Sequence, residues 1–97
     1  MTLSDAERKV ALEGLPGWRY DAADRAIRRD YVFADFGEAF AFMARAALAA
    51  EKADHHPDWS NSWNKVAVSL TTHSERGVTG KDVALARAMD GFAASLP

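Results

Sequence analysis

Three histidines are the side chains of this sequence best suited to proton transfer, and all of them lie between residues 51 and 82. His55 and His56 are adjacent and precede Pro57, and His73 lies further along the chain. Imidazole has an unperturbed pKa near 6.5, so it can donate or accept a proton at neutral pH. Several imidazoles around one pocket can share the acid and base steps of a reaction. The three histidines are therefore the candidate catalytic residues.

Two other interpretations of these histidines stay open. Adjacent histidines in a loop are commonly polar residues that cap the carbonyl groups of a helix end. A metal site with Asp54 or Asp58 as an extra ligand is the second alternative. The spacings HxH and HxxxH are missing, so we expect no metal. The sequence also has no cysteine, which excludes disulfides and thiolate zinc sites.

A helix over residues 36–53 should carry the histidine pair at its C-terminal end. Pro57 disfavours helical geometry at the residue before it, so the helix should end near Asp54. At that end the helix dipole, together with Glu51 or Asp54, would favour a charged imidazolium. That bias suits a general acid.

The start and the buried side of this helix are also predicted. Asp35 and Glu38 have the spacing of a capping box. One apolar stripe recurs at helical spacing and is predicted to face the core. Its members are Phe36, Phe40, Met43 and Ala47.

A strand over residues 65–72 should carry His73 at its end, because apolar and polar side chains alternate along it. After a polar turn, Thr79 with Asp82 should open a closing helix, in which Asp82 satisfies backbone donors of the first turn. The apolar stripe of that helix consists of Leu85, Met89, Phe92 and Leu96.

The remaining elements complete an α+β sandwich. Ser4 or Asp5 should open a first helix that ends near Gly14, and residues 18–20 and 26–33 should form an antiparallel hairpin. This order favours helices on one face of an antiparallel sheet, and residues 1–97 form one domain without a linker. Such a small sheet has exposed edges, which pairing with a second copy would cover.

Composition narrows the possible partners. The net charge is −2, and the one dense basic cluster, Arg25, Arg28 and Arg29, is flanked by Asp24 and Asp30. We interpret that cluster as a solvated strand face and expect no nucleic-acid partner. No apolar run is long enough for a membrane helix, and the N-terminus lacks the pattern of a signal peptide. We expect a cytoplasmic protein.

The chemistry-bearing residues stand in the order E-x3-H-H-P-x5-W-x9-H-x8-D, which resembles the signature of the pterin-4a-carbinolamine dehydratase family. Residues 35–59 resemble the family's second helix and the turn after it, and residues 64–73 resemble its central strand. Every position of the signature is met, by Glu51, His55, His56, Pro57, Trp63, His73 and Asp82.

The resemblance implies a four-stranded antiparallel sheet with three helices on one face, which adds a short strand near residues 58–60 to the elements above. It also implies dehydration of a 4a-hydroxytetrahydropterin to quinonoid dihydropterin and water, with no metal or organic cofactor. Such an enzyme would recycle tetrahydrobiopterin for an aromatic amino-acid hydroxylase such as phenylalanine hydroxylase. Members of the family are also known as dimerising partners of a transcription factor, so a protein-binding module is the alternative function. A homodimer or homotetramer is expected in either case.

By position, the resemblance assigns the active site. We expect His56 to be the acid on the leaving hydroxyl, while His55 or His73 acts at N5 and holds the pterin. Glu51 or Asp54 would orient an imidazole. Trp63 is expected to be a packing residue, and Asp82 a helix cap with a role behind an imidazole as the alternative. The predicted substrate-binding residues are His55, His56, Pro57, Thr72, His73, Ser74 and Glu75.

Overall fold

Strands with one apolar side build the sheet. In the computed structural model, which describes residues 1–96, strand β4 (Lys65–Leu70) buries every second residue: Val66, Val68 and Leu70. It lies in the middle of an antiparallel sheet with the strand order β1-β2-β4-β3. The other strands are β1 (Arg19–Asp21), β2 (Ala26–Val32) and β3 (Asp58–Ser62). The fourth strand, which the family resemblance implied near residues 58–60, is therefore present as β3.

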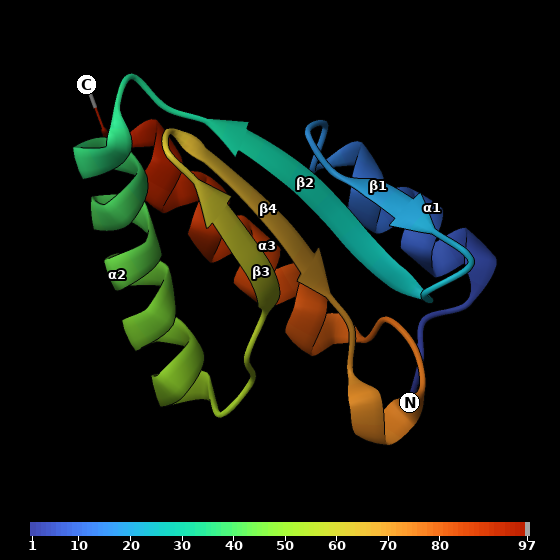
Figure 1. The fold of residues 1–97 in the computed structure, drawn as a ribbon. Coiled ribbons are helices and arrows are strands. Elements are labelled where there is room, and N and C mark those ends of the chain that lie inside the picture. The colour runs from blue at the N-terminus through green and yellow to red at the C-terminus, as the bar shows by residue number, and fades with distance from the viewer. Residues whose placement is uncertain (97) are drawn as a thin grey trace.

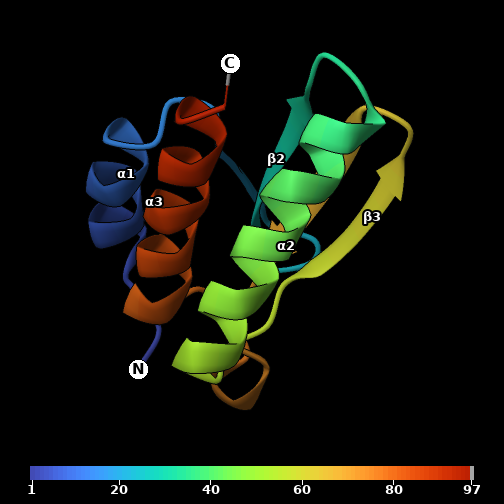
Figure 2. The ribbon, with the colours of Figure 1, turned by 90° about the vertical axis from the view of Figure 1, so that its left-hand side faces the viewer.

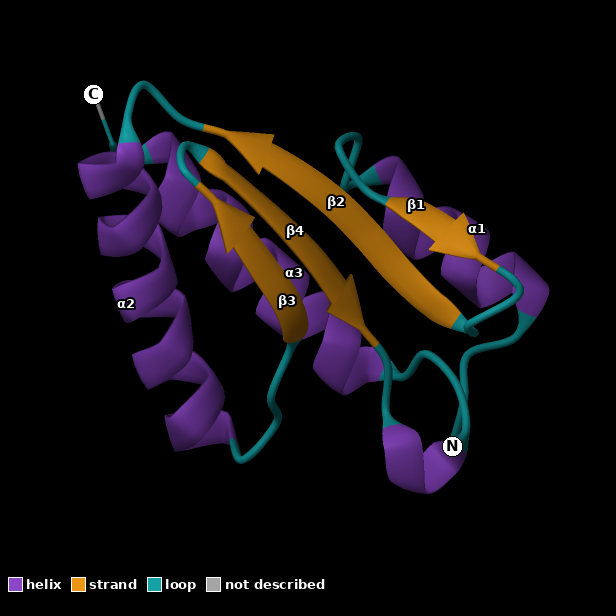
Figure 3. Ribbon diagram, viewed as in Figure 1, coloured by secondary structure: helices purple, strands orange, loops and turns teal. Residues whose placement is uncertain are grey.

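Three helices lie on one side of this sheet (Figures 1 and 2). They are α1 (Asp5–Glu13), α2 (Phe36–Ala53) and α3 (Gly80–Ala94), and a single 3-10 turn, η1 (His73–Glu75), follows β4. Helix α2 begins and ends at the predicted residues. The other face of the sheet carries no helix (Figure 3). The predicted α+β architecture is confirmed. Within residues 1–96, no helix has both the length and the apolar character needed to cross a membrane.

Local sequence signals explain where the helices begin. Ser4 caps α1 and Thr79 caps α3, and each forms a complete capping box with the acidic residue three positions later. Asp35 caps α2 by accepting a hydrogen bond from the backbone N–H of Glu38. These caps fix the direction from which the chain enters each helix.

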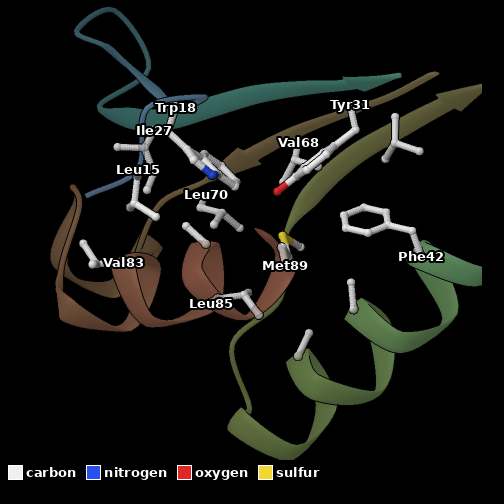
Figure 4. Close-up of a cluster of buried hydrophobic side chains, with 14 of the residues drawn as sticks. Leu15, Trp18, Ile27, Tyr31, Phe42, Val68, Leu70, Val83, Leu85 and Met89 are labelled. Carbon is white, nitrogen blue, oxygen red and sulfur yellow. The ribbon is translucent and has the colours of Figure 1, made fainter. Parts of the chain in front are cut away.

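The core fills the space between the sheet and the helices (Figure 4). Phe42 of α2 is fully buried and contacts the rings of Tyr31 and Phe33. Met89 of α3 is also fully buried, and Leu85 is nearly so. The predicted apolar stripe of the closing helix is therefore confirmed, with Phe92 and Leu96 packed at its edge.

The predicted core stripe of α2 is wrong at three of its four positions, and the fourth, Met43, is partly buried and packs against the core. Phe40 is 59% exposed and Phe36 is 48% exposed, and Ala47 is also exposed. The helix is apolar on two sides, and the side with the smaller residues packs inward because small side chains let α2 approach α3 and the sheet closely. The buried stripe consists of Ala39, Phe42, Ala46 and Ala50.

Asp90 joins the C-terminal half of α3 to the sheet. Its Oδ1 accepts hydrogen bonds from Nε1 of Trp18 at 3.0 Å, from a guanidinium nitrogen of Arg29 at 2.9 Å and from the hydroxyl of Tyr31. Burial, together with the hydrogen bond to Asp90, raises the pKa of Tyr31 above its usual range. The expectation that Arg29 belongs to a solvated strand face is therefore wrong. Arg28, in contrast, does lie on the open face beside Asp21 and Asp24.

Candidate active site

The end of helix α2 turns the first histidine inward. Asp54 adopts left-handed backbone geometry with φ of 50°, and its N–H bonds to the carbonyl oxygens of Ala50 and Glu51. The N–H of His55 then bonds to the same Ala50 carbonyl at 3.0 Å. Such a left-handed residue reverses the chain at a helix C-terminus. His55 therefore points back under the helix and is buried, while His56 is exposed.

His55 is bound to a fully buried carboxylate. Its Nε2 lies 2.5 Å from Oδ1 of Asp82, which has no exposed surface. The other carboxylate oxygen accepts hydrogen bonds from the Thr72 hydroxyl and from the backbone N–H of Thr79, both at 2.8 Å. A buried carboxylate needs such partners because its desolvation is costly. Asp82 thus caps α3 and also binds an imidazole. The two roles that were predicted as alternatives are both present.

The second ring nitrogen of His55 is free. Nδ1 makes no hydrogen bond within residues 1–96, and no side-chain nitrogen or oxygen in that range is both buried and without a partner. Nδ1 must therefore reach solvent, although only 10% of the His55 side chain is exposed. His55 is one of the residues that line a groove of about 230 Å³ between α2 and α3, whose other walls include Ala49, Lys81 and Ala84.

His56 points outward and contacts the last turn of α2. Its Nε2 lies 2.7 Å from Oε1 of Glu51, and 55% of the His56 side chain is exposed. Of the two carboxylates predicted to orient an imidazole, Glu51 is the one that contacts His56. Asp54 makes no side-chain hydrogen bond or ion pair within the described chain, so its predicted contact with a histidine is not formed.

His73 contacts a carboxylate on the neighbouring strand. It lies in η1, directly after β4, and its Nε2 is 3.3 Å from Oδ2 of Asp58, the first residue of β3. The antiparallel register places Asp58 opposite Ser69, which lies two residues before Thr71. The His73 side chain is 76% exposed. Each of the three histidines therefore has a carboxylate partner.

A polar cavity of about 430 Å³ opens beside His73 on the face of the sheet that carries no helix. Arg28, Ser69 and Asp58 form one row across three strands at its floor, because the register aligns them. Its other walls include Ser60 and Thr71. This surface is rich in hydroxyl groups and charges, so it suits a polar ligand.

The three imidazoles gather at one end of the sheet but face different ways. The turn after α2 and the turn after β4 both lie at that end (Figures 1 and 2). Asp82 connects them, since it binds both His55 and Thr72, the residue before His73. However, His55 lines the groove between the helices, whereas His73 lines the cavity on the sheet.

The other predicted site residues have clear positions. Pro57 is half-buried and Ser74 is exposed. The Thr72 hydroxyl is occupied by Asp82 and Thr79, so this buried side chain is not free to bind substrate. Glu75 pairs with the N-terminal amine, whose hydrogen bond and charge lower the pKa of that carboxyl. The side chain of Glu75 is thus partly occupied as well.

The expectation for Trp63 is wrong. Its side chain is 65% exposed, and its φ of 50° places it in the tight turn between β3 and β4. A turn residue at the tip of a hairpin projects beyond the sheet, so Trp63 cannot pack in the core of this chain. It also lies at the opposite end of β4 from His73.

Two further residues belong to the site and were not predicted as substrate-binding or supporting residues. Asp58 was considered only as a metal ligand, and its pairing with His73 depends on the register of β3, which the sequence does not show. Thr79 was recognised as a cap, but its contact with Thr72 at 2.7 Å is a tertiary contact. Within residues 1–96, His, Asp and Glu side chains do not gather in a group of three or more that could hold a metal ion.

Comparison with known proteins identifies the family. Residues 1–92 match the family model described as pterin 4 alpha carbinolamine dehydratase. The chain belongs to this family. A relative of this dehydratase family from Rhizorhabdus wittichii, provisionally named pterin-4-alpha-carbinolamine dehydratase, is 54% identical over 91 residues, which cover 94% of each chain. A protein of Rhodopseudomonas palustris with the same provisional name is 55% identical over 94 residues, which cover 97% of this chain and 93% of that protein.

A solved structure of the dehydratase family has the same fold. It is the crystal structure of a transcriptional coactivator/pterin dehydratase from Brucella melitensis, with a TM-score of 0.94 and 49% sequence identity. The match covers 96% of this chain and 99% of that chain. The family resemblance and the fold that it implies are both confirmed.

Proposed function

We propose that this protein dehydrates a 4a-hydroxytetrahydropterin to quinonoid dihydropterin and water by histidine acid and base catalysis. The observation that carries the proposal is that all three histidines contact carboxylates, in two segments that Asp82 connects. Imidazoles held by carboxylates are the usual groups for proton transfer at neutral pH. Membership in the dehydratase family supports the identity of the substrate.

The reaction needs two proton transfers. The C4a–O bond breaks and the oxygen leaves as water after it receives a proton from an acid. The N5–H bond gives its electron pair to a new N5=C4a double bond, and a base takes the proton. His56 is our candidate acid, because it is exposed and its contact with the Glu51 carboxylate orients the ring. His55 or His73 is the candidate base. We expect the reaction to need no metal or organic cofactor, so dialysis against a chelator should leave the rate unchanged.

The decisive experiment measures the breakdown of 4a-hydroxytetrahydropterin by absorbance, with and without the purified protein. The wild type should accelerate the reaction, and His56→Ala should lower turnover by roughly 100-fold or more. Lys9→Ala, at an exposed position on α1, is the control and should retain the wild-type rate. A wild type that does not accelerate breakdown would show that the proposed function is wrong.

We also propose self-association into a homodimer or homotetramer, and a role in recycling the pterin of an aromatic amino-acid hydroxylase. Strands β1 and β3 form the two edges of the sheet, and each has one side without a partner strand in this chain. Sedimentation at micromolar concentration should give the mass of a dimer or a tetramer. A monomer would contradict the association.

A protein-binding module is the second candidate function. The observation that favours it is the apolar stripe that α2 leaves outside the core, in which Phe36, Phe40 and Leu48 are largely exposed. A coactivator-like role is consistent with the description of the Brucella melitensis relative. If none of the histidine variants loses dehydratase activity, the protein-binding function is favoured over the catalytic function.

A further inference from the structure

Asp82 is the one fully buried charged residue among those that contact the histidines. Its two carboxylate oxygens have different hydrogen-bond partners. Oδ1 faces Nε2 of His55, and Oδ2 accepts from Thr79 N–H and from the Thr72 hydroxyl. The helix cap requires only the second set of contacts. The contact between Oδ1 and His55 is therefore not needed for the cap and can serve another function.

A carboxylate can only accept hydrogen bonds, so Nε2 of a neutral His55 must carry the proton. Nδ1 then has no proton and presents a lone pair. Because Nδ1 has no partner within residues 1–96 and reaches solvent, it is the ring atom that a ligand can meet. In a catalytic triad, a carboxylate fixes the tautomer of the catalytic imidazole and stabilises the imidazolium that forms when the ring takes up a proton. Asp82 and His55 have the same arrangement.

We infer that Asp82 is a positioning residue that holds His55 with its proton on Nε2, so that Nδ1 is the base that takes the proton from N5 of the pterin. The inference rests on the proposed function for the identity of the substrate. The electron pair of the N5–H bond forms the N5=C4a double bond, and the hydroxyl leaves with the proton of the separate acid. His55 then carries a positive charge next to the Asp82 carboxylate, which offsets the cost of placing that charge in a largely buried site.

Asp82→Asn changes the tautomer while it can keep the helix cap. The amide oxygen must stay toward the N–H of Thr79, because that group only donates. The amide NH2 then faces Nε2 of His55 and can only donate to it. Nε2 must lose its proton, and the proton moves to Nδ1. The variant therefore presents a donor where the wild type presents an acceptor.

The test reads the tautomer directly by nitrogen-15 NMR of histidine-labelled protein, at a pH where the imidazoles are neutral. The spectrum of His55→Gln assigns the His55 signals. The wild type should show the proton of His55 on Nε2, and Asp82→Asn should show it on Nδ1. A wild-type His55 with its proton on Nδ1 would overturn the inference, and this part of the test does not depend on whether Asp82→Asn folds.

Turnover provides the second measurement. Asp82→Asn should lower kcat by roughly 100-fold, with the dissociation constant of the pterin product unchanged within about twofold. Thr72→Val is the matched control, because it removes one hydrogen bond to Oδ2 and leaves the contact between His55 and Oδ1. It should lower stability and keep the wild-type tautomer.

The two proposals fail in different ways. If the wild type does not accelerate pterin dehydration, the proposed function is wrong, and the NMR result still decides the role of Asp82 in fixing the tautomer. If the wild type is active and Asp82→Asn inverts the tautomer without a loss of kcat, Nδ1 of His55 is not the base. His73 would then become the candidate for the proton of N5.

Discussion

Phe40 and Phe42 lie two positions apart on helix α2 and face opposite ways: Phe42 is fully buried, whereas Phe40 is 59% exposed. Phe42 contacts the rings of Tyr31 and Phe33, with ring centroids 4.5 and 5.1 Å away. Phe40 contacts only Phe36 among the aromatic rings of the described chain, at 5.9 Å. The same residue type thus has a core role at one position and a surface role at the other.

Replacing these two residues should therefore have unequal effects on the stability of the folded chain. Phe42→Ala should lower the free energy of unfolding by about 3–5 kcal/mol, because it removes a buried ring and leaves a cavity. Phe40→Ala should change the stability of the monomer by less than about 1 kcal/mol. Urea denaturation at low protein concentration measures both values. Equal losses in the two variants would contradict the observed orientation of α2.

Helix α2 also shows what the sequence can and cannot predict. Its bounds were predicted correctly because capping by Asp35 and the restriction before Pro57 are local effects. Its buried side was not, because apolar residues occupy two sides of the helix and the choice between them depends on how closely α3 and the sheet approach. A helical period alone cannot make that choice.

The candidate site follows the same division. The histidines were found from residue type, and Asp82 was connected with them through the family signature. The partner of His73 was not, because Asp58 reaches it through the antiparallel register of β3 and β4. Trp63 was misplaced for a related reason, since the turn at its position was not apparent from the alternation of residues 65–72. The hairpin formed by β3 and β4 decides both cases.

Tyr31 should make the protein sensitive to alkaline pH. Burial, and next the hydrogen bond to Asp90, raise the pKa of its hydroxyl. The folded state therefore keeps this proton at pH values where the unfolded chain, with a tyrosine pKa near 10, loses it. This contribution to stability is complete below about pH 10 and falls as the pH rises further, because the unfolded state then binds fewer protons than the folded state.

Tyr31→Phe isolates this effect. At pH 7 the variant should lose roughly 1 kcal/mol, since the hydrogen bond to Asp90 is removed. Between pH 9.5 and 11 its free energy of unfolding should decline less steeply than that of the wild type. Denaturation curves across this range test the prediction. Parallel curves would show that Tyr31 ionises like an ordinary tyrosine.

Asp58 should affect the reaction more than the fold. Its ion pair with His73 is largely exposed, and exposed pairs contribute only about 0–1 kcal/mol to stability. Asp58→Asn should leave the unfolding midpoint nearly unchanged and lower kcat/KM several-fold, because the imidazole loses the carboxylate that orients it. Asp30→Asn is the matched control, since Asp30 is an exposed aspartate of β2 that pairs with Arg19, far from η1. A similar loss in both variants would point to a general effect of surface charge.

Glu51 should tune the exposed imidazole of His56. Its carboxylate lies 2.7 Å from Nε2 of that ring, and both side chains are mostly exposed, so Glu51→Gln should not alter stability measurably. Removal of the charge weakens the contact that orients the imidazole, so His56 should deliver its proton less effectively. The predicted result is a several-fold lower kcat. Asp54→Asn, three residues away, removes a carboxylate that contacts no histidine in the described chain and should keep the wild-type kcat. If both variants lose the same activity, or if Glu51→Gln matches the wild type, His56 does not depend on its carboxylate partner for the acid step.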